Sequence, residues 1–213
     1  MFKYNHRNII IIEKPEEIGW DAIHSIIFAS HTSAHKDGGV QATAFYSGEE
    51  LRHKIGGGKC FVALDEGVAI GTCSLVIKEI HAWFYSGEVA YYMWDAVLPS
   101  YQGTGVYSQL DEARDQYIRE RNVKVIITRT SERNRKMQRI RMRKGYRKVS
   151  FAATTQTNYY SVLLARWVDE CPFPLWYCFL RYKLIEIKTR LLYKEGGSET
   201  CLMRLFSTLR SLF

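Results

Sequence analysis

The sequence lacks long hydrophobic runs, because nowhere do about 18 uncharged apolar residues follow one another. No membrane-spanning helix is therefore predicted. The stretch 1–17 has an apolar run of only four residues before charge returns, which is too short for a signal peptide. Five cysteines, an odd number, without a secretion signal predict reduced thiols in the cytoplasm.

Several catalytic and metal-binding motifs are also missing. The cysteines show no paired spacing, and no HExxH or GxSxG motif occurs, so no metal site and no serine-hydrolase elbow is predicted. A Walker loop is excluded because no Lys-Ser/Thr pair follows the glycine-bearing turn near residue 103. A Rossmann fingerprint is excluded because Ser108 stands where its third glycine would be.

Positive charge is abundant and concentrated in one place. The chain of 213 residues is 46% hydrophobic and 24% charged, which is typical of a globular protein, and its net charge is +8. Residues 129–148 hold ten Lys or Arg against one acid, and residues 172–213 hold seven against three. A concentrated basic segment indicates an anionic partner: the phosphates of a cofactor, a nucleic acid or a lipid surface.

Hydrophobic periodicity predicts a mixed α/β domain over 1–171, followed by a basic amphipathic helical tail over 172–213. Helix start and stop signals and alternating apolar runs place the elements. Helices are expected at 15–33, at 48–55 behind a Ser47 capping box, and at 105–122, 132–145 and 175–194, with a short one from residue 200 onward; strands are expected at 8–14, 59–65, 67–80, 88–99, 123–130, 146–155 and 159–167.

The segment SYQGTGVYSQL, residues 100–110, places two glycines between a predicted strand and a predicted helix. Glycines let backbone N–H groups approach an anion closely, and a helix N-terminus adds unpaired N–H groups and a positive dipole end. These features are typical of a phosphate cradle. A purely structural turn explains the glycines alone equally well.

Two motifs together resemble the GNAT-type N-acetyltransferases. VLPSYQGTGV is similar to the acyl-CoA signature of that family, with Gln102 and Gly105 matching, and NRKMQRIRMRKGY is similar to its second motif, with Asn134 and Gly145 at the expected offsets. The resemblance implies a mixed, mostly antiparallel sheet flanked by helices, and transfer of an acetyl group from acetyl-CoA to a primary amine. It assigns cofactor binding to Ala96, Val97, Leu98, Gln102, Gly103, Thr104, Gly105, Val106, Tyr107 and Asn134.

The sequence departs from this family at two positions. Tyr107 stands where the family prefers Gly or Ala, and Arg141 stands where the family usually has a tyrosine thought to protonate the leaving thiolate. Arginine does not readily give up a proton, because its pKa is above about 12. Arg141 is therefore expected either to stabilise negative charge in catalysis or to be a solvated residue of a basic helix.

Asp95 is the expected general base. Strand alternation puts it on one face with Tyr91, Met93 and Val97, and it is the only acid in that apolar stretch. An isolated carboxylate among apolar side chains would have a raised pKa, which suits a base. A hydrogen-bonded structural Asp is the alternative.

Three further residues are expected at the acceptor site. His31 lies in a region that often lines the acceptor cleft, and Trp83 and Tyr85 lie in a connection, where substrate contacts are common. The alternatives are a surface histidine and core aromatic rings.

Other functions and partners remain open at this stage. The basic helix suggests an amine carried by a nucleic acid, such as a charged tRNA, and the two departures suggest a non-catalytic module that binds CoA. In the tail, Trp176, Leu180, Leu184, Ile187 and Leu191 share one helical face. This face is expected to pack on protein, either its own domain or a homodimer partner, rather than on a membrane surface.

Overall fold

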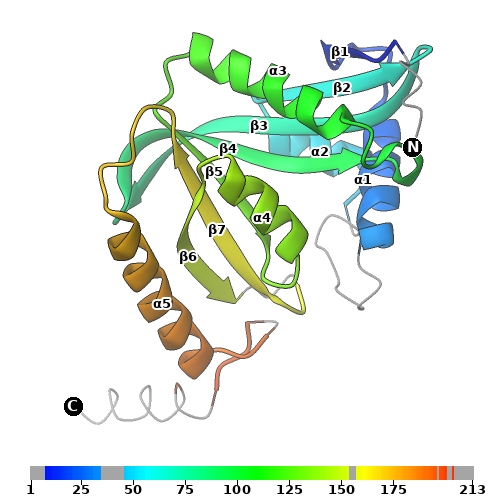
Figure 1. Cartoon of the computed structure of the whole chain (residues 1–213). Helices are drawn as coiled ribbons and strands as arrows, with labels where there is room; N and C mark the ends of the chain where they lie inside the picture. Colours follow the sequence, from blue (N-terminus) through cyan, green and yellow to red (C-terminus); the bar gives the residue numbers. More distant parts are fainter. Residues whose placement is uncertain (1–7, 35–45, 154–156, 196, 201–202, 204–213) are drawn as a thin grey trace, which may run out of the picture. The chain divides into compact units, whose positions relative to one another are not determined.

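The computed structural model describes residues 8–34, 46–153, 157–195, 197–200 and 203 (Figure 1). It divides into two compact units. The N-terminal unit comprises Met1–Gly38, Thr43–His81 and Ser86–Val123, and the C-terminal unit comprises Gly39–Ala42, Ala82–Tyr85 and Lys124–Phe213. The expected second helix of the tail, from residue 200 onward, falls almost entirely outside the described residues.

The N-terminal unit contains four neighbouring strands in the order β1-β2-β3-β4. β1 and β2 pair antiparallel, as do β2 and β3. The elements are β1 (Ile10–Glu13), α1 (Trp20–Ala34), α2 (Gly48–Ile55), β2 (Lys59–Asp65), β3 (Val68–Ala82), β4 (Tyr85–Val97), a 3-10 turn η2 (Pro99–Tyr101) and α3 (Val106–Glu120).

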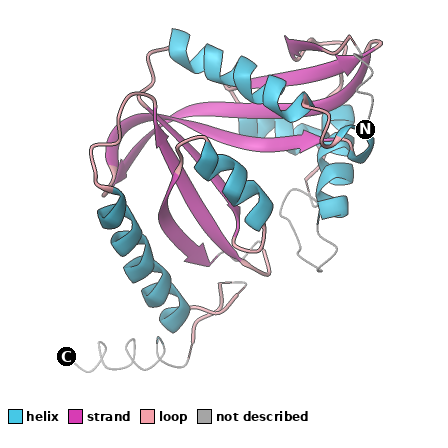
Figure 2. Ribbon diagram, in the orientation of Figure 1, coloured by secondary structure: helices cyan, strands magenta, loops and turns pink. Residues whose placement is uncertain are grey.

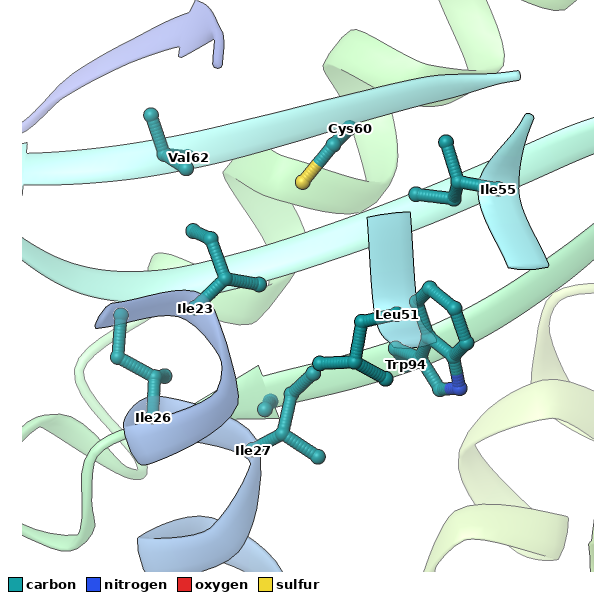
Figure 3. Packing of buried hydrophobic residues seen from close by; sticks show 9 residues of the cluster. Ile23, Ile26, Ile27, Leu51, Ile55, Cys60, Val62 and Trp94 are labelled. Atoms are coloured by element: carbon teal, nitrogen blue, oxygen red, sulfur yellow. The ribbon is translucent and has the colours of Figure 1, made fainter. Parts of the chain in front are cut away.

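Helices cover both faces of these strands. On one face, α1 and α2 bury a hydrophobic cluster against β2 and β4, in which Ile23, Leu51 and Trp94 meet (Figure 3). On the other face, α3 packs on β3, where the Cys73 thiol donates a hydrogen bond of 3.4 Å to the Leu110 carbonyl. The site described below lies on this α3 side and at the end of β4.

The C-terminal unit contains three antiparallel strands in the order β5-β7-β6. Its elements are β5 (Val125–Ser131), α4 (Arg135–Arg143), β6 (Arg147–Ala153), β7 (Tyr160–Trp167) and α5 (Leu175–Leu192). α5 lies along β6, as Figures 1 and 2 show. The Thr189 hydroxyl donates to the Phe151 carbonyl at 3.1 Å, which ties the two elements together.

The elements expected from the sequence within the described residues are all present; most of their ends are shifted by one to three residues, and the start of one helix is shifted further. The helix predicted from Pro15 begins at Trp20 instead. Residues 15–18 form a turn in which the Ile18 N–H donates a hydrogen bond to the Pro15 carbonyl. The first carbonyl that accepts a helical hydrogen bond is that of Gly19. The predicted capping box is confirmed: the Ser47 side chain accepts from the Glu50 N–H, and the Glu50 carboxylate accepts from the Ser47 N–H.

Candidate functional site

The glycine turn leads directly into an uncapped helix N-terminus. Gly103 and Gly105 have φ values of 84° and 93°, which are left-handed conformations that side chains with a Cβ rarely adopt. Space is open where each Cβ would be, with no heavy atom within 4 Å among the atoms described. Gly105 is the N-cap of α3, so no side chain caps the helix, and its first turn has no acid. The first N–H groups of a helix have no intrahelical acceptor, so this end of α3 offers donors to an anion.

Gln102 ties this turn to the end of β4. Its side-chain amide donates to the Val97 carbonyl at 3.2 Å. The Leu98 N–H donates to the Ile70 carbonyl of β3 at 2.9 Å. The sequence assigns backbone groups of residues 96–98 to the cofactor, but the Leu98 N–H is bound within the sheet. Because hydrogen-bonding direction alternates along a strand, the Val97 N–H points to the edge of β4 opposite β3.

A backbone irregularity at Trp94 changes which side chains share a face. Trp94 has a φ of 56°, in the left-handed region, where a bulky residue is a strained outlier. Met93 and Trp94 both pack with the α1–α2 cluster, although they are consecutive. Tyr92 and Asp95 both bond to α3. The expectation that Met93 and Asp95 share a face is therefore wrong, because one residue in an unusual conformation interrupts strand alternation.

Asp95 is not isolated, contrary to the premise on which its role as a base was predicted. The Arg114 guanidinium of α3 donates to the Asp95 carboxylate at 2.5 Å and to the Asp111 carboxylate at 2.8 Å. Arg114 is completely buried, and it also donates to the Ser74 carbonyl at 3.0 Å. Burial opposes the charge of Arg114, but the carboxylates, Asp95 first, hold its pKa well above the ordinary value.

Sequence analysis missed Arg114 because charged helix residues usually face solvent. A signal was available, since Leu110, Arg114 and Ile118 are spaced by four residues and share one face of α3. All three are completely buried. A cation in line with two core residues indicates a buried ion pair with carboxylates from a neighbouring element.

The residues of the second motif lie in the C-terminal unit. The Asn134 side-chain carbonyl caps α4 by accepting from the Met137 N–H at 3.0 Å. Arg141 is 1% exposed, so it is not a solvated residue of a basic helix. Its guanidinium lies 5.2 Å from the centre of the Tyr146 ring. Neither arrangement tests a role in cofactor binding or catalysis.

The three expected acceptor-site residues occupy different surroundings. His31 is half-buried in the last turn of α1. Trp83 forms the β3–β4 turn with Phe84, and Tyr85 begins β4. Trp83 was expected in a connection where its side chain could contact the acceptor. Instead its indole N–H donates to the Val149 carbonyl at 3.0 Å, and its ring contacts Phe173.

Two features are absent from the described residues. No group of three or more His, Cys, Asp or Glu side chains there is arranged to hold a metal ion. No helix in the described part of the chain combines the length and the hydropathy needed to cross a bilayer.

The chain is similar to known proteins in sequence pattern and in fold. The model of the acetyltransferase (GNAT) family matches residues 20–146, which is more than half of the chain and includes the glycine turn, Arg114 and α4. No curated protein matched the chain in sequence.

Solved structures share the fold at low sequence identity. The ribosomal-protein-S18-alanine N-acetyltransferase from Escherichia coli is 15% identical with a TM-score of 0.57, covering 76% of this chain and 95% of its own. An N-acetyltransferase from Staphylococcus aureus is 13% identical with a TM-score of 0.58, and Ard1 from Thermoplasma volcanium is 17% identical with 0.56. Each of these two covers 76% of this chain and 99% of its own.

Proposed function

The chain belongs to the acetyltransferase (GNAT) family of acetyl-CoA-dependent N-acetyltransferases, and we propose that it binds the pyrophosphate of acetyl-CoA at the N-terminus of α3. The observation that carries this proposal is the uncapped helix end behind two left-handed glycines, with open space beyond both. Backbone N–H groups at such a helix end, together with the positive end of its dipole, suit a phosphate. Gly103, Thr104, Gly105, Val106 and Tyr107 form this element.

Tyr107 fits the proposal despite its size. It is half-buried, while its neighbour Val106 is completely buried. Side chains in a helix lean toward its N-terminus, which brings the Tyr107 ring next to the proposed anion site. We assign Tyr107 to the wall of the cofactor site.

The end of β4 orients the acyl group in this proposal. Acetyl-CoA supplies a thioester whose carbonyl needs a hydrogen-bond donor as negative charge develops on its oxygen. The Val97 N–H is the donor that we assign, because the Leu98 N–H is bound to Ile70 and Gln102 holds the Val97 carbonyl. The strained backbone at Trp94 and the Arg114–Asp95 pair fix the strand just before this donor.

We assign Asp95 a positioning role instead of the general-base role expected from the sequence. Protonating Asp95 would disrupt its ion pair with buried Arg114, so proton removal from the amine at this carboxylate carries an added cost. The pair connects α3, which carries the phosphate-binding end, with β4, which carries the acyl-binding end. Arg141 and Asn134 remain assigned to thiolate stabilisation and cofactor contact, respectively, as their places in the second motif suggest.

The acceptor is a primary amine, on a small molecule or on a polymer, and His31 and Tyr85 are proposed to contact it. We propose that the enzyme works in the cytoplasm. Free thiols at Cys60, Cys73, Cys171 and Cys178 support this, because reduced cysteines are typical of that compartment.

A matched pair of glycine variants tests the cofactor site. Gly105→Val and Gly67→Val replace left-handed glycines with similar φ values, 93° and 81°, and both have open space around them. Both should lose similar stability, roughly 1–2 kcal/mol. Only Gly105→Val should weaken acetyl-CoA binding measured by calorimetry, by about tenfold or more. Equal affinity for acetyl-CoA in the two variants would place the phosphate site elsewhere.

A further inference from the structure

The outward face of α5 is apolar and exposed. Trp176 is 66% exposed, Leu184 is 54% exposed, and Leu180, Ile187 and Leu191 are exposed to similar extents. No described segment covers this face. The expectation that the stripe packs on its own domain is not met within the described residues, because the opposite face of α5, with buried Cys178 and Tyr182, packs on β6.

Positive charges flank the apolar face on both sides. At about 100° per residue, Lys183 and Arg190 lie along one edge of the stripe, and Arg181 and Lys188 lie along the other. The only acid of α5, Glu186, is turned toward the groove, where it accepts from Lys183 at 2.8 Å and Arg190 at 3.2 Å. A solvent-facing apolar stripe with large side chains and cations on both flanks is typical of helices that lie in a membrane interface.

A basic groove adjoins one edge of this helix. It has a volume of about 740 Å³ and runs between α4 and α5. Leu175 and Phe179 line it and belong also to the exposed apolar surface, as does Met142 of α4. The groove therefore adjoins exposed apolar residues at the N-terminal end of α5, next to the stripe.

Lys183 and Arg190 of the groove pair with Glu186, and Arg190 also pairs with Glu132, but three other cations of the groove lie outside these pairs. Among the described residues, no carboxylate lies within 4.0 Å of the charged groups of Arg135, Arg139 or Lys148, all of which line the groove. Burial lowers the pKa of Lys148, Glu186 opposes the shift, and the positive charges of Lys183 and Arg135 add to it. An anion in this groove would relieve the repulsion between these cations.

A second copy of the chain is a poor match for this surface. In a two-fold symmetric dimer each surface meets itself, so the cations along the edges of α5 would face those of the partner. Like charges brought together across an interface cost free energy. Lipid phosphates, by contrast, match both the groove and the flanking cations. The chain after residue 200 has the same composition, with seven apolar residues, Arg204, Arg210 and no acid among residues 201–213.

We propose that the C-terminal unit binds the surface of an anionic phospholipid membrane, with the stripe of α5 among the acyl chains and lipid phosphates in the α4–α5 groove. This places the acetyltransferase next to a membrane, a location that its family membership does not assign. The proposal does not depend on the proposed phosphate-binding turn at residues 103–107, which lies in the N-terminal unit.

Vesicle flotation with the full chain tests the proposal. The probes are vesicles of phosphatidylcholine alone and vesicles containing phosphatidylglycerol. The double variant Leu180→Gln/Leu184→Gln removes two exposed apolar side chains. Val68→Gln is the control, because Val68 is an apolar residue of the N-terminal unit that is at least as exposed. Arg139→Gln removes one groove cation, and Arg52→Gln removes an exposed cation of α2 as its control.

The expected result is binding to phosphatidylglycerol vesicles that falls with added salt, and little binding to phosphatidylcholine alone. The double variant should bind at least about tenfold more weakly, and Arg139→Gln about fivefold more weakly. Both controls should bind as the parent does, and all variants should keep its melting temperature.

Three results would overturn the proposal. The first is the absence of vesicle binding together with a dimer, seen by analytical ultracentrifugation, that the double variant turns into a monomer. The second is a monomer without vesicle binding that loses stability in the double variant, which would mean that its own C-terminal segment covers α5. The third is salt-sensitive binding to RNA, but not to vesicles, that Arg139→Gln weakens.

Discussion

Helices α3 and α5 depart from the usual distribution of polar and apolar residues in opposite ways. α3 buries a cation completely, and α5 exposes a row of large apolar side chains. In α3 the unusual group is satisfied within the protein, because Arg114 meets Asp95 and Asp111. In α5 no described residue covers the unusual face.

This difference indicates that α3 makes its unusual contacts inside the protein, whereas α5 offers its unusual face to a partner outside it. A buried ion pair fixes the position of the elements that it joins, and here it joins α3 to β4, the two elements to which we assign cofactor binding. An apolar face left open indicates a partner outside the protein. The buried charge of α3 thus holds in place the elements that we assign to acetyl transfer. The exposed apolar face of α5 is the surface that we assign to membrane binding. The following predictions test this comparison.

The largest effect is expected from Arg114→Met, which removes the cation that pairs with buried Asp111 and with partly buried Asp95. We expect a loss of about 3–5 kcal/mol in the free energy of unfolding, measured by urea denaturation. Arg119→Met is the control on the same helix, because Arg119 is exposed and pairs with Glu112 at the surface. It should cost less than about 1 kcal/mol. Similar losses in the two variants would show that Arg114 does not hold α3 in place.

Replacing one leucine in each helix separates buried from open apolar surface. Leu110→Ala in α3 should cost about 2–5 kcal/mol of unfolding free energy, because Leu110 is completely buried. Leu184→Ala in α5 should change it by less than about 0.5 kcal/mol in the absence of lipid. A loss of several kcal/mol for Leu184→Ala would mean that protein already covers this face.

The variant Asp95→Asn tests whether Asp95 positions β4 and α3 or acts as the general base that removes a proton from the amine. The amide oxygen can still accept from Arg114, but the charge is lost, so we expect about 1–3 kcal/mol of destabilisation. Acetyl transfer should slow while the pH dependence of kcat/KM keeps its shape. If an ionisation disappears from that profile in the variant, Asp95 is the general base after all.

The smallest effect concerns cysteine reactivity, which reports how closely each helix is packed. Burial raises the pKa of Cys73, which lies beneath α3, and raises the pKa of Cys178, on the buried face of α5, to about 11. At pH 8 both thiols are protonated, so alkylation followed by mass spectrometry should find them slower than half-buried Cys171. In urea the three rates should converge. A Cys178 rate equal to that of Cys171 at pH 8 in native protein would mean that α5 does not stay on β6.

Local signals predicted much of the fold. The capping box at Ser47 and Glu50 was predictable because its partners are three residues apart. The glycine turn at Gly103 and Gly105 was predictable because its sequence resembles a known motif. The start of α1 was placed wrongly at Pro15. Proline is favoured both at the first position of a helix and in a tight turn, and here it begins a turn.

The interior of the site was not predictable in the same way. Asp95 looks isolated in the sequence, and its partner Arg114 is 19 residues away on α3. The left-handed backbone at Trp94 reverses strand alternation, and no turn residue marks it in the sequence. Both features depend on packing between elements, which the order of residues in one strand does not encode.

Hydrogen–deuterium exchange with acetyl-CoA tests the central claim most directly. The account predicts that acetyl-CoA slows exchange most at the Val97 N–H and at the N–H groups of Gly105, Val106 and Tyr107, because these donors are assigned to the acyl and phosphate groups. In Gly105→Val the slowing should vanish at the same acetyl-CoA concentration, while Gly67→Val should behave as the parent does. Unchanged exchange across residues 97–108 at saturating acetyl-CoA, with slowing elsewhere, would contradict the account.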